Sequence, residues 1–205
     1  MKEKNQVLTR GFLVIIAFFF IFSCAVIPEL KVNYSLPSAS DKLKNEELLL
    51  TVRDSRTKSF VLGERASAEL KNCPGSLTLN VAVPGEAPVR KGIFQVPELV
   101  EEVFRTRLEN EGVRLFPDLS RSEPELLIVI KDLFLDIEDR KWVARMGYEA
   151  RLIKEGKVAA TRSVSGKVER YSVFGLKEAN MVLSEIVTDM VNELDVRRLF
   201  RDSGL

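Results

Sequence analysis

Apolar and polar residues alternate in the middle of the chain in a way that predicts two long strands. From 144 to 152 every second position is apolar or small, and charged residues or glycine lie between them. Side chains two positions apart share one face of a strand, so this segment is typical of a half-buried strand. The turn sequence Lys-Glu-Gly-Lys at 154–157 predicts a hairpin, with a return strand from 158 to about 171.

Other segments carry weaker strand patterns. Residues 48–52 and 126–130 are continuous apolar runs, which are typical of buried strands. Residues 133–137 then alternate, so the second run continues toward an exposed end. Residues 77–83 alternate between two Pro-Gly pairs and predict a half-buried strand that could lie at a sheet edge. A short strand is also expected at 32–36.

Two segments have helical spacing. A helix is expected to open at Pro97, where acidic residues suit the positive end of its dipole, and to close at Gly112. Arg107 is expected on its water-facing side. A second helix is expected from about 176 to 200, with a wide apolar stripe. The order of these elements predicts an α+β fold, a largely antiparallel sheet with two main helices packed on one face.

The N-terminus has the layout of an export signal. Basic residues precede an apolar run at 12–22, and Ser23 and Cys24 follow it. The string Ile21-Phe22-Ser23-Cys24 resembles a bacterial lipobox. This resemblance implies that the thiol of Cys24 receives diacylglycerol, that residues 1–23 are removed as a signal peptide, and that the new amine is acylated. Two or three acyl chains, such as palmitate, hold a protein stably on a bilayer.

Two other interpretations of this segment stay open. An uncleaved helix over 12–27 is shorter than the roughly 20 residues that cross the hydrocarbon core. Cleavage after Ala25 would release a soluble chain. The turn-rich composition that follows is typical of a linker. The expected organisation is therefore a lipoprotein signal peptide at 1–23, a tether at 24–47 and a single α+β periplasmic domain at 48–205.

Composition excludes several kinds of chemistry. The chain has no histidine, so Ser-His-Asp and Cys-His catalysis and His-bearing zinc sites are excluded. The formal net charge is +1 with the leader included, and a near-balanced charge argues against nucleic-acid binding. With Cys24 acylated, Cys73 is expected to be a small buried hydrophobe, or else an intermolecular partner or reactive thiol. We expect no cofactor and no metal site.

Charged residues near strand ends are the remaining candidates for chemistry. Asp136 and Glu138 would share one strand face, and paired carboxylates can hydrolyse glycosides when a cleft fixes their separation. At a polar strand end, a solvated rim is the preferred interpretation. Asp54 and Arg56 follow the strand at 48–52 and form either a ligand-facing pair or a turn cap with a solvated arginine. We therefore expect no catalytic residue, and the protein is not expected to be an enzyme.

With the lipobox, the string Val52-Arg53-Asp54-Ser55-Arg56, the helix end at Glu111-Gly112 and the long hairpin, the chain resembles the YajG-like bacterial lipoproteins over about residues 20–200. More distantly, it is similar to accessory lipoproteins of envelope ABC transport systems and to LptE. The resemblance implies an envelope protein without catalysis that works through protein contacts. Ala25 follows the lipidated cysteine, which in enteric relatives favours the outer membrane of a Gram-negative bacterium.

The expected function is that of a membrane-anchored accessory or scaffold protein of the cell envelope, facing the periplasm and binding another envelope protein. The alternatives are a carrier or sensor that binds an apolar or glycan ligand between helix and sheet, and an envelope hydrolase. Trp142 lies in a charged turn and is either an exposed contact residue or buried under the last helix. Arg145, Glu149 and Arg151 form a second candidate partner surface, or a plain wet sheet face.

Overall fold

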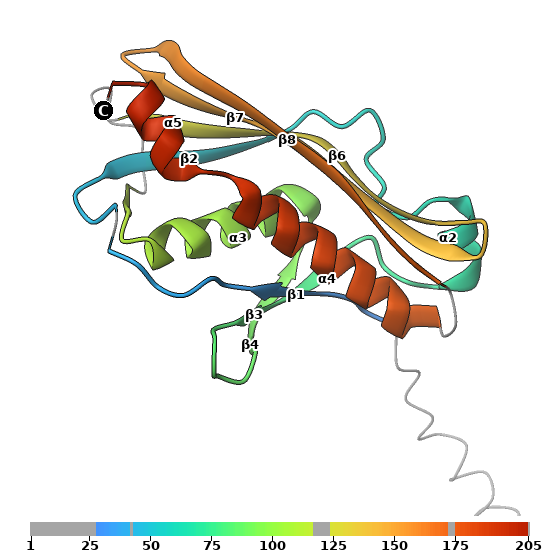
Figure 1. Ribbon diagram of the computed structural model, residues 1–205. Coiled ribbons are helices and arrows are strands. Elements are labelled where there is room, and N and C mark those ends of the chain that lie inside the picture. The colour runs from blue at the N-terminus through green and yellow to red at the C-terminus, as the bar shows by residue number, and fades with distance from the viewer. Residues whose placement is uncertain (1–27, 42, 117–123, 172–174, 205) are drawn as a thin grey trace, which may run out of the picture.

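Two β-sheets lie on either side of a pair of helices (Figure 1). The computed structural model describes residues 28–41, 43–116, 124–171 and 175–204. Cys24 and the expected signal peptide lie outside these residues. The elements in chain order are β1 (Leu30–Ser35), β2 (Glu47–Asp54), α2 (Glu64–Glu69), β3 (Leu77–Ala82), β4 (Val89–Phe94), α3 (Val96–Asn110), β5 (Arg114–Phe116), β6 (Glu125–Glu138), β7 (Lys141–Lys154), β8 (Lys157–Tyr171), α4 (Gly175–Glu193) and α5 (Val196–Asp202).

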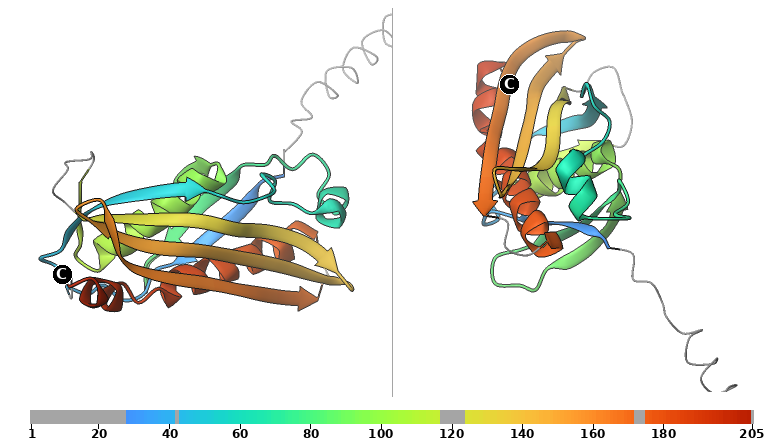
Figure 2. Two further views of the ribbon diagram at one scale, coloured as in Figure 1. Left: turned by 90° about the horizontal axis from the view of Figure 1, so that it is seen from above. Right: turned by 90° about the vertical axis from the view of Figure 1, so that its right-hand side faces the viewer.

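The larger sheet has the strand order β5-β2-β6-β7-β8. Strand β2 is parallel to β5 and β6, whereas β6, β7 and β8 form an antiparallel meander. Glu155 and Gly156 both have positive φ in the turn between β7 and β8, which confirms the predicted hairpin. Figure 2 shows the three long strands running side by side. The predicted α+β class is thus confirmed, with helices packed against a mostly antiparallel sheet.

The smaller sheet, β1-β3-β4, was not expected as a separate unit. Strand β3 lies at its centre, parallel to β1 and antiparallel to β4, and so is not an edge strand. Residues 30–35 form β1, which confirms the short strand expected at 32–36 but places it in a sheet rather than in the tether. The side chains of Leu30, Val32 and Tyr34 are fully buried. The folded domain therefore includes residues well before position 48. The sequence pattern missed this because β1 pairs with β3, which lies far along the chain.

Local capping interactions set the ends of the two main helices. At the start of α3 the backbone N–H of Gln95 donates to Glu98 Oε2 at 2.7 Å, and Gly112 follows its C-terminal end with φ 90°. The helix expected at 176–200 is instead divided into α4 and α5. The carboxylate of Asp195 accepts from the backbone N–H of Arg198 at 2.8 Å, so a new N-cap interrupts the helix.

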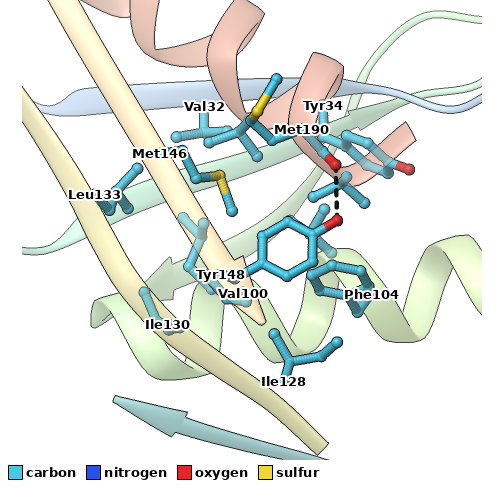
Figure 3. Close-up of a cluster of buried hydrophobic side chains, with 14 of the residues drawn as sticks. Val32, Tyr34, Val100, Phe104, Ile128, Ile130, Leu133, Met146, Tyr148 and Met190 are labelled. Atoms are coloured by element: carbon cyan, nitrogen blue, oxygen red, sulfur yellow. Dashed lines mark hydrogen bonds between the residues drawn. The ribbon is translucent and has the colours of Figure 1, made fainter. Parts of the chain in front are cut away.

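One continuous hydrophobic core joins both sheets and both main helices. Figure 3 shows its centre, where the ring of Tyr148 from β7 meets Phe104 of α3 edge to face with centroids 5.2 Å apart. The Tyr148 hydroxyl donates to the backbone carbonyl of Met190 in α4 at 2.9 Å. This buried hydrogen bond ties the larger sheet to α4 and satisfies a polar atom that would otherwise be costly to bury.

Candidate functional site

A bulge in β6 and the loop after β2 create a depression on the outer face of the larger sheet. Strand β2 pairs with β6 up to Asp54 and Ile130, and the register of β6 with β7 shifts just beyond that point. The chain then leaves the sheet over 55–60 and returns to β6, where the backbone N–H of Leu135 donates to Val61 O at 2.8 Å. The loop at 55–60 therefore lies next to the bulge at Lys131 of β6.

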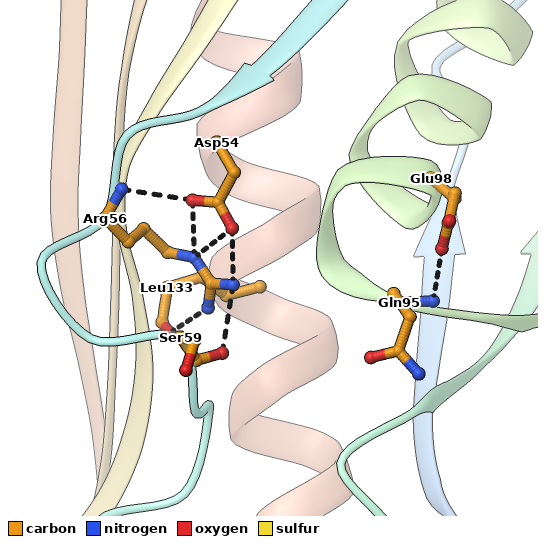
Figure 4. A network of polar contacts seen from close by, with 6 residues as sticks. All are labelled: Asp54, Arg56, Ser59, Gln95, Glu98 and Leu133. Atoms are coloured by element: carbon orange, nitrogen blue, oxygen red, sulfur yellow. Dashed lines mark hydrogen bonds and ion pairs between the residues drawn. The ribbon is translucent and has the colours of Figure 1, made fainter.

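Arg56 holds this loop in place (Figure 4). Its Nη2 donates to Asp54 Oδ2 at 2.8 Å and to Ser59 O at 3.1 Å. Its backbone N–H also donates to Asp54 Oδ1 at 3.0 Å, the turn cap that was one of the two predicted roles of Asp54. The Arg56 side chain, however, is only 5% exposed rather than solvated. Hydrogen bonds from Arg56 lower the pKa of Asp54, which favours the charged carboxylate. The ion pair and the bond from Arg56 to Ser59 O together position the loop.

The depression has a volume of about 320 Å³ and combines positive charge with aromatic rings. The Lys58 ammonium lies 5.6 Å from the ring centroid of Phe60 and 5.7 Å from that of Phe134. The guanidinium of Arg145 lies 5.2 Å from the Phe134 centroid, within cation–π distance. We call this surface the basic-aromatic depression; its lining residues are Arg56, Thr57, Lys58, Phe60, Lys131, Asp132, Leu133, Phe134 and Arg145.

Of the four residues predicted as possible partner surface, Arg145, Glu149 and Arg151 share the half-exposed face of β7, whereas Trp142 lies on its buried face. Arg145 lines the basic-aromatic depression. Glu149 and Arg151 form an ion pair with each other further along β7, opposite Val129 and Leu127 of β6. Trp142 is 0% exposed and belongs to the core cluster, so the buried alternative describes this residue and it offers no contact surface.

The acidic residues of β6 are engaged separately. Asp132 lines the basic-aromatic depression. Asp136 Oδ1 accepts from the backbone N–H of Ala66 at 2.9 Å and so stabilises the first turn of α2. Glu138 forms ion pairs with Arg145 at 3.3 Å and Lys167 at 3.4 Å. Asp136 and Glu138 therefore do not share a cleft of the kind that glycoside hydrolysis uses.

Lys58, Phe60, Lys131 and Phe134 are site residues that the sequence pattern did not reveal. Residues 60–68 carry no clear periodicity, and the bulge at Lys131 is established by the register of β6 against β7. A sequence signal did exist in the break between the continuous apolar run of 126–130 and the alternation from 133. A change of period inside one strand is consistent with an inserted residue.

The other predictions concern Cys73, membrane-spanning helices and metal sites. Cys73 is partly buried and packs against the core, and its thiol contacts the carbonyl of Pro28 at 3.4 Å. Burial raises the pKa of Cys73. None of the helices among the described residues combines the length and hydropathy needed to cross a membrane. Within the same residues, no cluster of three potential metal ligands occurs.

Several solved structures have a fold similar to that of this chain. No family model matches the sequence, and no curated protein matches it. Protein XCC0632 from Xanthomonas campestris, of the family DUF330, is similar with a TM-score of 0.50 and 16% identity, covering 88% of this chain and 100% of its own. Rare lipoprotein B from Shewanella oneidensis has a TM-score of 0.39 and 12% identity, covering 78% of this chain and 94% of its own. The lipoprotein GNA1162 from Neisseria meningitidis has a TM-score of 0.36 and 12% identity, covering 72% of this chain and 99% of its own.

At these identities the likeness concerns the fold alone. The resemblance to YajG-like lipoproteins that the sequence indicated is therefore supported as a shared α+β architecture, carried by the structure of XCC0632.

Proposed function

We propose that this protein is a lipid-anchored, non-catalytic accessory protein of the bacterial envelope that binds an acidic segment of a partner protein in the basic-aromatic depression. The observation that carries this proposal is the convergence of Lys58, Lys131 and Arg145 with two phenyl rings on one exposed loop and sheet face. Loops held by a rigid scaffold are frequent positions for binding residues.

The charges and rings together define the partner's chemistry. Asp54 neutralises Arg56, and Glu138 forms an ion pair with Arg145 at 3.3 Å. Lys58 and Lys131, together with the partly compensated Arg145, therefore face the carboxylate of Asp132. A carboxylate of the partner would be attracted to these cations, and complementary charge raises association rates and selects partners. Phe60 is 53% exposed, so it offers apolar area to a neighbouring hydrophobic side chain of the same segment. An acidic segment that contains a hydrophobic residue fits both features.

The expected lipid anchor at Cys24 would keep this surface close to the membrane. Leu30 at the start of β1 follows Cys24 by only six positions. At most about 3.5 Å of chain per residue, the core of the domain would begin within roughly 20 Å of the acylated sulfur. The partner is therefore expected in or near the same membrane, and Ala25 favours the outer membrane for both.

Site-specific photocrosslinking in intact cells tests the binding surface. A photoreactive phenylalanine analogue at position 60 is expected to capture one defined protein. Arg145→Glu should strongly reduce capture because it reverses a charge in the depression, whereas Lys157→Glu, in the exposed β7–β8 turn, is the charge-matched control and should leave it unchanged. Equal capture in both variants would show that the depression does not bind the partner.

The anchor is tested separately by mass spectrometry of the protein extracted from membranes. A mature chain that begins at Cys24 with diacylglycerol and an N-acyl group is expected. Cys24→Ser should release the protein from the membrane fraction and weaken photocapture from position 60, because it lowers the local concentration near the partner. A mass that includes residues 1–23, or an unmodified N-terminus, would contradict lipid anchoring without bearing on the depression.

A further inference from the structure

The turn between β3 and β4 is exposed and largely apolar. Every residue from 83 to 91 is exposed, yet residues 83–89 carry a single charge, on Glu86. Val83 is 38% exposed and Val89 is 58% exposed. Connections between strands are ordinarily polar, because they run through water. We call residues 83–89 the apolar tip; its sequence is Val-Pro-Gly-Glu-Ala-Pro-Val.

The apolar tip has a defined shape. The backbone N–H of Glu86 donates to Val83 O at 3.0 Å, and Gly85 has φ 85°. Proline at the second position of a turn and glycine with positive φ at the third are typical of a type II turn. Figure 1 shows the tip projecting from β3 and β4 on the side of the molecule away from the larger sheet. Val83 and Val89, at the two ends of the tip, are thus held at a projecting point of the domain.

Strand β4 is poorly suited to pairing with a strand of another protein, although it lies at the edge of the smaller sheet. Pro88 directly precedes the strand and has no N–H to donate. The register of β4 with β3 skips Lys91, so this exposed residue bulges out of the ladder. Proline, a bulge and an exposed lysine are features by which natural edge strands avoid pairing. A strand of a partner or of a second copy is therefore a poor occupant for this surface.

The expected anchor would bring a bilayer within reach of the apolar tip. Cys24 precedes Leu30 by six positions, so the acylated sulfur would lie within roughly 20 Å of Leu30. Leu30 pairs with Leu77 of β3. Six further positions, or about 20 Å of strand, separate Leu77 from Val83. The reach of the tether matches the distance to the tip, so the acyl chains and the tip can enter the same bilayer.

Cations next to the apolar tip suit lipid headgroups. Arg90 and Lys91 follow the tip, and both are exposed. Within the described residues, Lys91 has no ion-pair partner, whereas Arg90 Nη2 lies 3.7 Å from Glu29 Oε1. Glu86 in the tip offsets part of this positive charge. Exposed apolar side chains beside a lysine are typical of surfaces that lie at a membrane interface, where anionic headgroups attract the ammonium group.

We propose that the apolar tip is a second membrane contact, in which Val83 and Val89 enter the interfacial region of the bilayer that carries the acylated Cys24, and Lys91 binds headgroup phosphates. This contact rests on the proposed lipid anchor, which supplies the local concentration that so small an apolar surface needs. The anchor alone would leave the domain free to rotate. Contact at the tip would turn the basic-aromatic depression away from the bilayer, because the depression lies on the outer face of the larger sheet.

Fluorescence quenching by lipid tests this contact. The acylated full chain, with Cys73→Ala to remove the other thiol, receives an NBD label through Val89→Cys and is reconstituted into vesicles of phosphatidylethanolamine and phosphatidylglycerol. A phospholipid with a nitroxide near the top of its acyl chain quenches only a label at the interface. Val158→Cys is the matched control, because Val158 is 54% exposed but lies at the start of β8. Quenching is expected to be severalfold stronger at position 89 than at position 158.

Further variants test the cause of the quenching. Val83→Asp removes an apolar side chain from the tip and adds a carboxylate that anionic headgroups repel, so the quenched population at position 89 should fall about tenfold, equivalent to about 1.4 kcal/mol. Val158→Asp is the matched control and should leave quenching at position 89 unchanged. Lys91→Glu should lower quenching more in these vesicles than in phosphatidylcholine vesicles, because only phosphatidylglycerol carries a net negative charge.

The outcomes for the tip and for the anchor are separate. Equal quenching at positions 89 and 158 of an acylated, vesicle-bound chain overturns the tip contact and leaves the anchor intact. A blue-shifted label at position 89 that the nitroxide lipid does not quench also overturns it, because another copy of the chain then covers the tip. A chain that mass spectrometry shows to be unacylated contradicts the anchor. If that chain still floats with vesicles and is quenched at position 89, the tip contact stands without the anchor; if it does not float, the tip contact is overturned as well.

Discussion

The backbone N–H of Asn33 in β1 donates a hydrogen bond to Ser184 Oγ of α4 at 2.8 Å. The same pattern repeats on either side, where Lys31 N–H donates to Asn180 Oδ1 at 2.8 Å and Ser35 N–H to Thr188 Oγ1 at 3.2 Å. Four residues of helix rise about 6 Å and two residues of strand about 6.6 Å, so the two spacings match. Strand β1 lies at the edge of the smaller sheet, with β3 on one side. On its other side, a row of polar side chains of α4 accepts hydrogen bonds from the backbone N–H groups of β1.

Removing one member of this row should loosen β1. Ser184→Ala leaves the Asn33 N–H without its acceptor, and we expect the free energy of unfolding to fall by about 1 kcal/mol, because water can partly replace the lost bond. Urea denaturation measures this change, and amide hydrogen exchange should show faster exchange at Asn33. Asp189→Ala, exposed on the same helix, is the control and should change neither quantity. Unchanged exchange at Asn33 would contradict the role of Ser184.

The approach of Gly63 to Asp136 predicts a steric effect. A Cβ added at Gly63 would lie 2.2 Å from Asp136 Cγ, the carboxyl group that accepts from the N–H of Ala66. Gly63→Ala should therefore displace this carboxylate and lower the free energy of unfolding by about 1–3 kcal/mol. Thermal unfolding measures the loss. Gly75→Ala has no neighbouring atom within 4 Å and should be nearly neutral, and an equal effect at both glycines would count against the steric explanation.

Trp142 is the single tryptophan of the chain and reports directly on its own burial. Because its side chain is fully buried in the core, we expect blue-shifted fluorescence emission and little quenching by acrylamide in the native protein. Both properties should change to those of a solvated indole on unfolding in guanidinium. Water-like emission from the native protein would instead place Trp142 on the surface and return it to the candidate contact residues.

An exposed charge cluster on the outer sheet face predicts a pH dependence. Hydrogen bonds from Lys167 and Lys141 lower the pKa of Glu169 from 4.5 to about 2. A carboxyl group with a lowered native pKa stabilises the fold above its unfolded pKa, and this contribution is lost as the pH falls from 4.5 toward 2. The melting temperature should therefore decline in that window, and less so at high salt, because exposed ion pairs are screened.

Glu169→Gln tests this assignment. The amide cannot ionise, so the variant should show a flatter melting temperature between pH 4.5 and pH 2 than the native chain. Glu155→Gln, in the exposed β7–β8 turn, is the matched control and should keep the native profile. Identical profiles for Glu169→Gln and the native chain would remove Glu169 as the cause.

Much of the larger sheet was predictable because its signals are local. The alternation along 144–152 and the turn at 154–157 each depend on neighbouring residues, and the structure confirms β7, β8 and their hairpin. The same holds for α3, whose start and end carry their own capping residues. The division between α4 and α5 was missed although Asp195 is a typical N-cap residue, because the apolar stripe continues on both sides of it.

The candidate site was far less predictable, since it is built from segments that meet only in the folded chain. Arg145 was identified on the outer face of β7, but Lys58 and Phe60 reach it through a loop whose course depends on how Val61 pairs with β6. Arg107 carries the helical position of an exposed residue, yet it is only 7% exposed in the folded chain. No pattern along α3 contains that information.

By itself, the sequence determined the periodic elements, the α+β class, the absence of histidine chemistry and the expectation of an acylated Cys24, because these follow from residue identity and short-range spacing. Only the tertiary structure decided that β1 belongs to the core, that Trp142 lies inside and that Arg107 is buried beside Glu111. Burial depends on which distant elements pack against a residue, and that choice is made by the free energy of the whole fold rather than by local spacing.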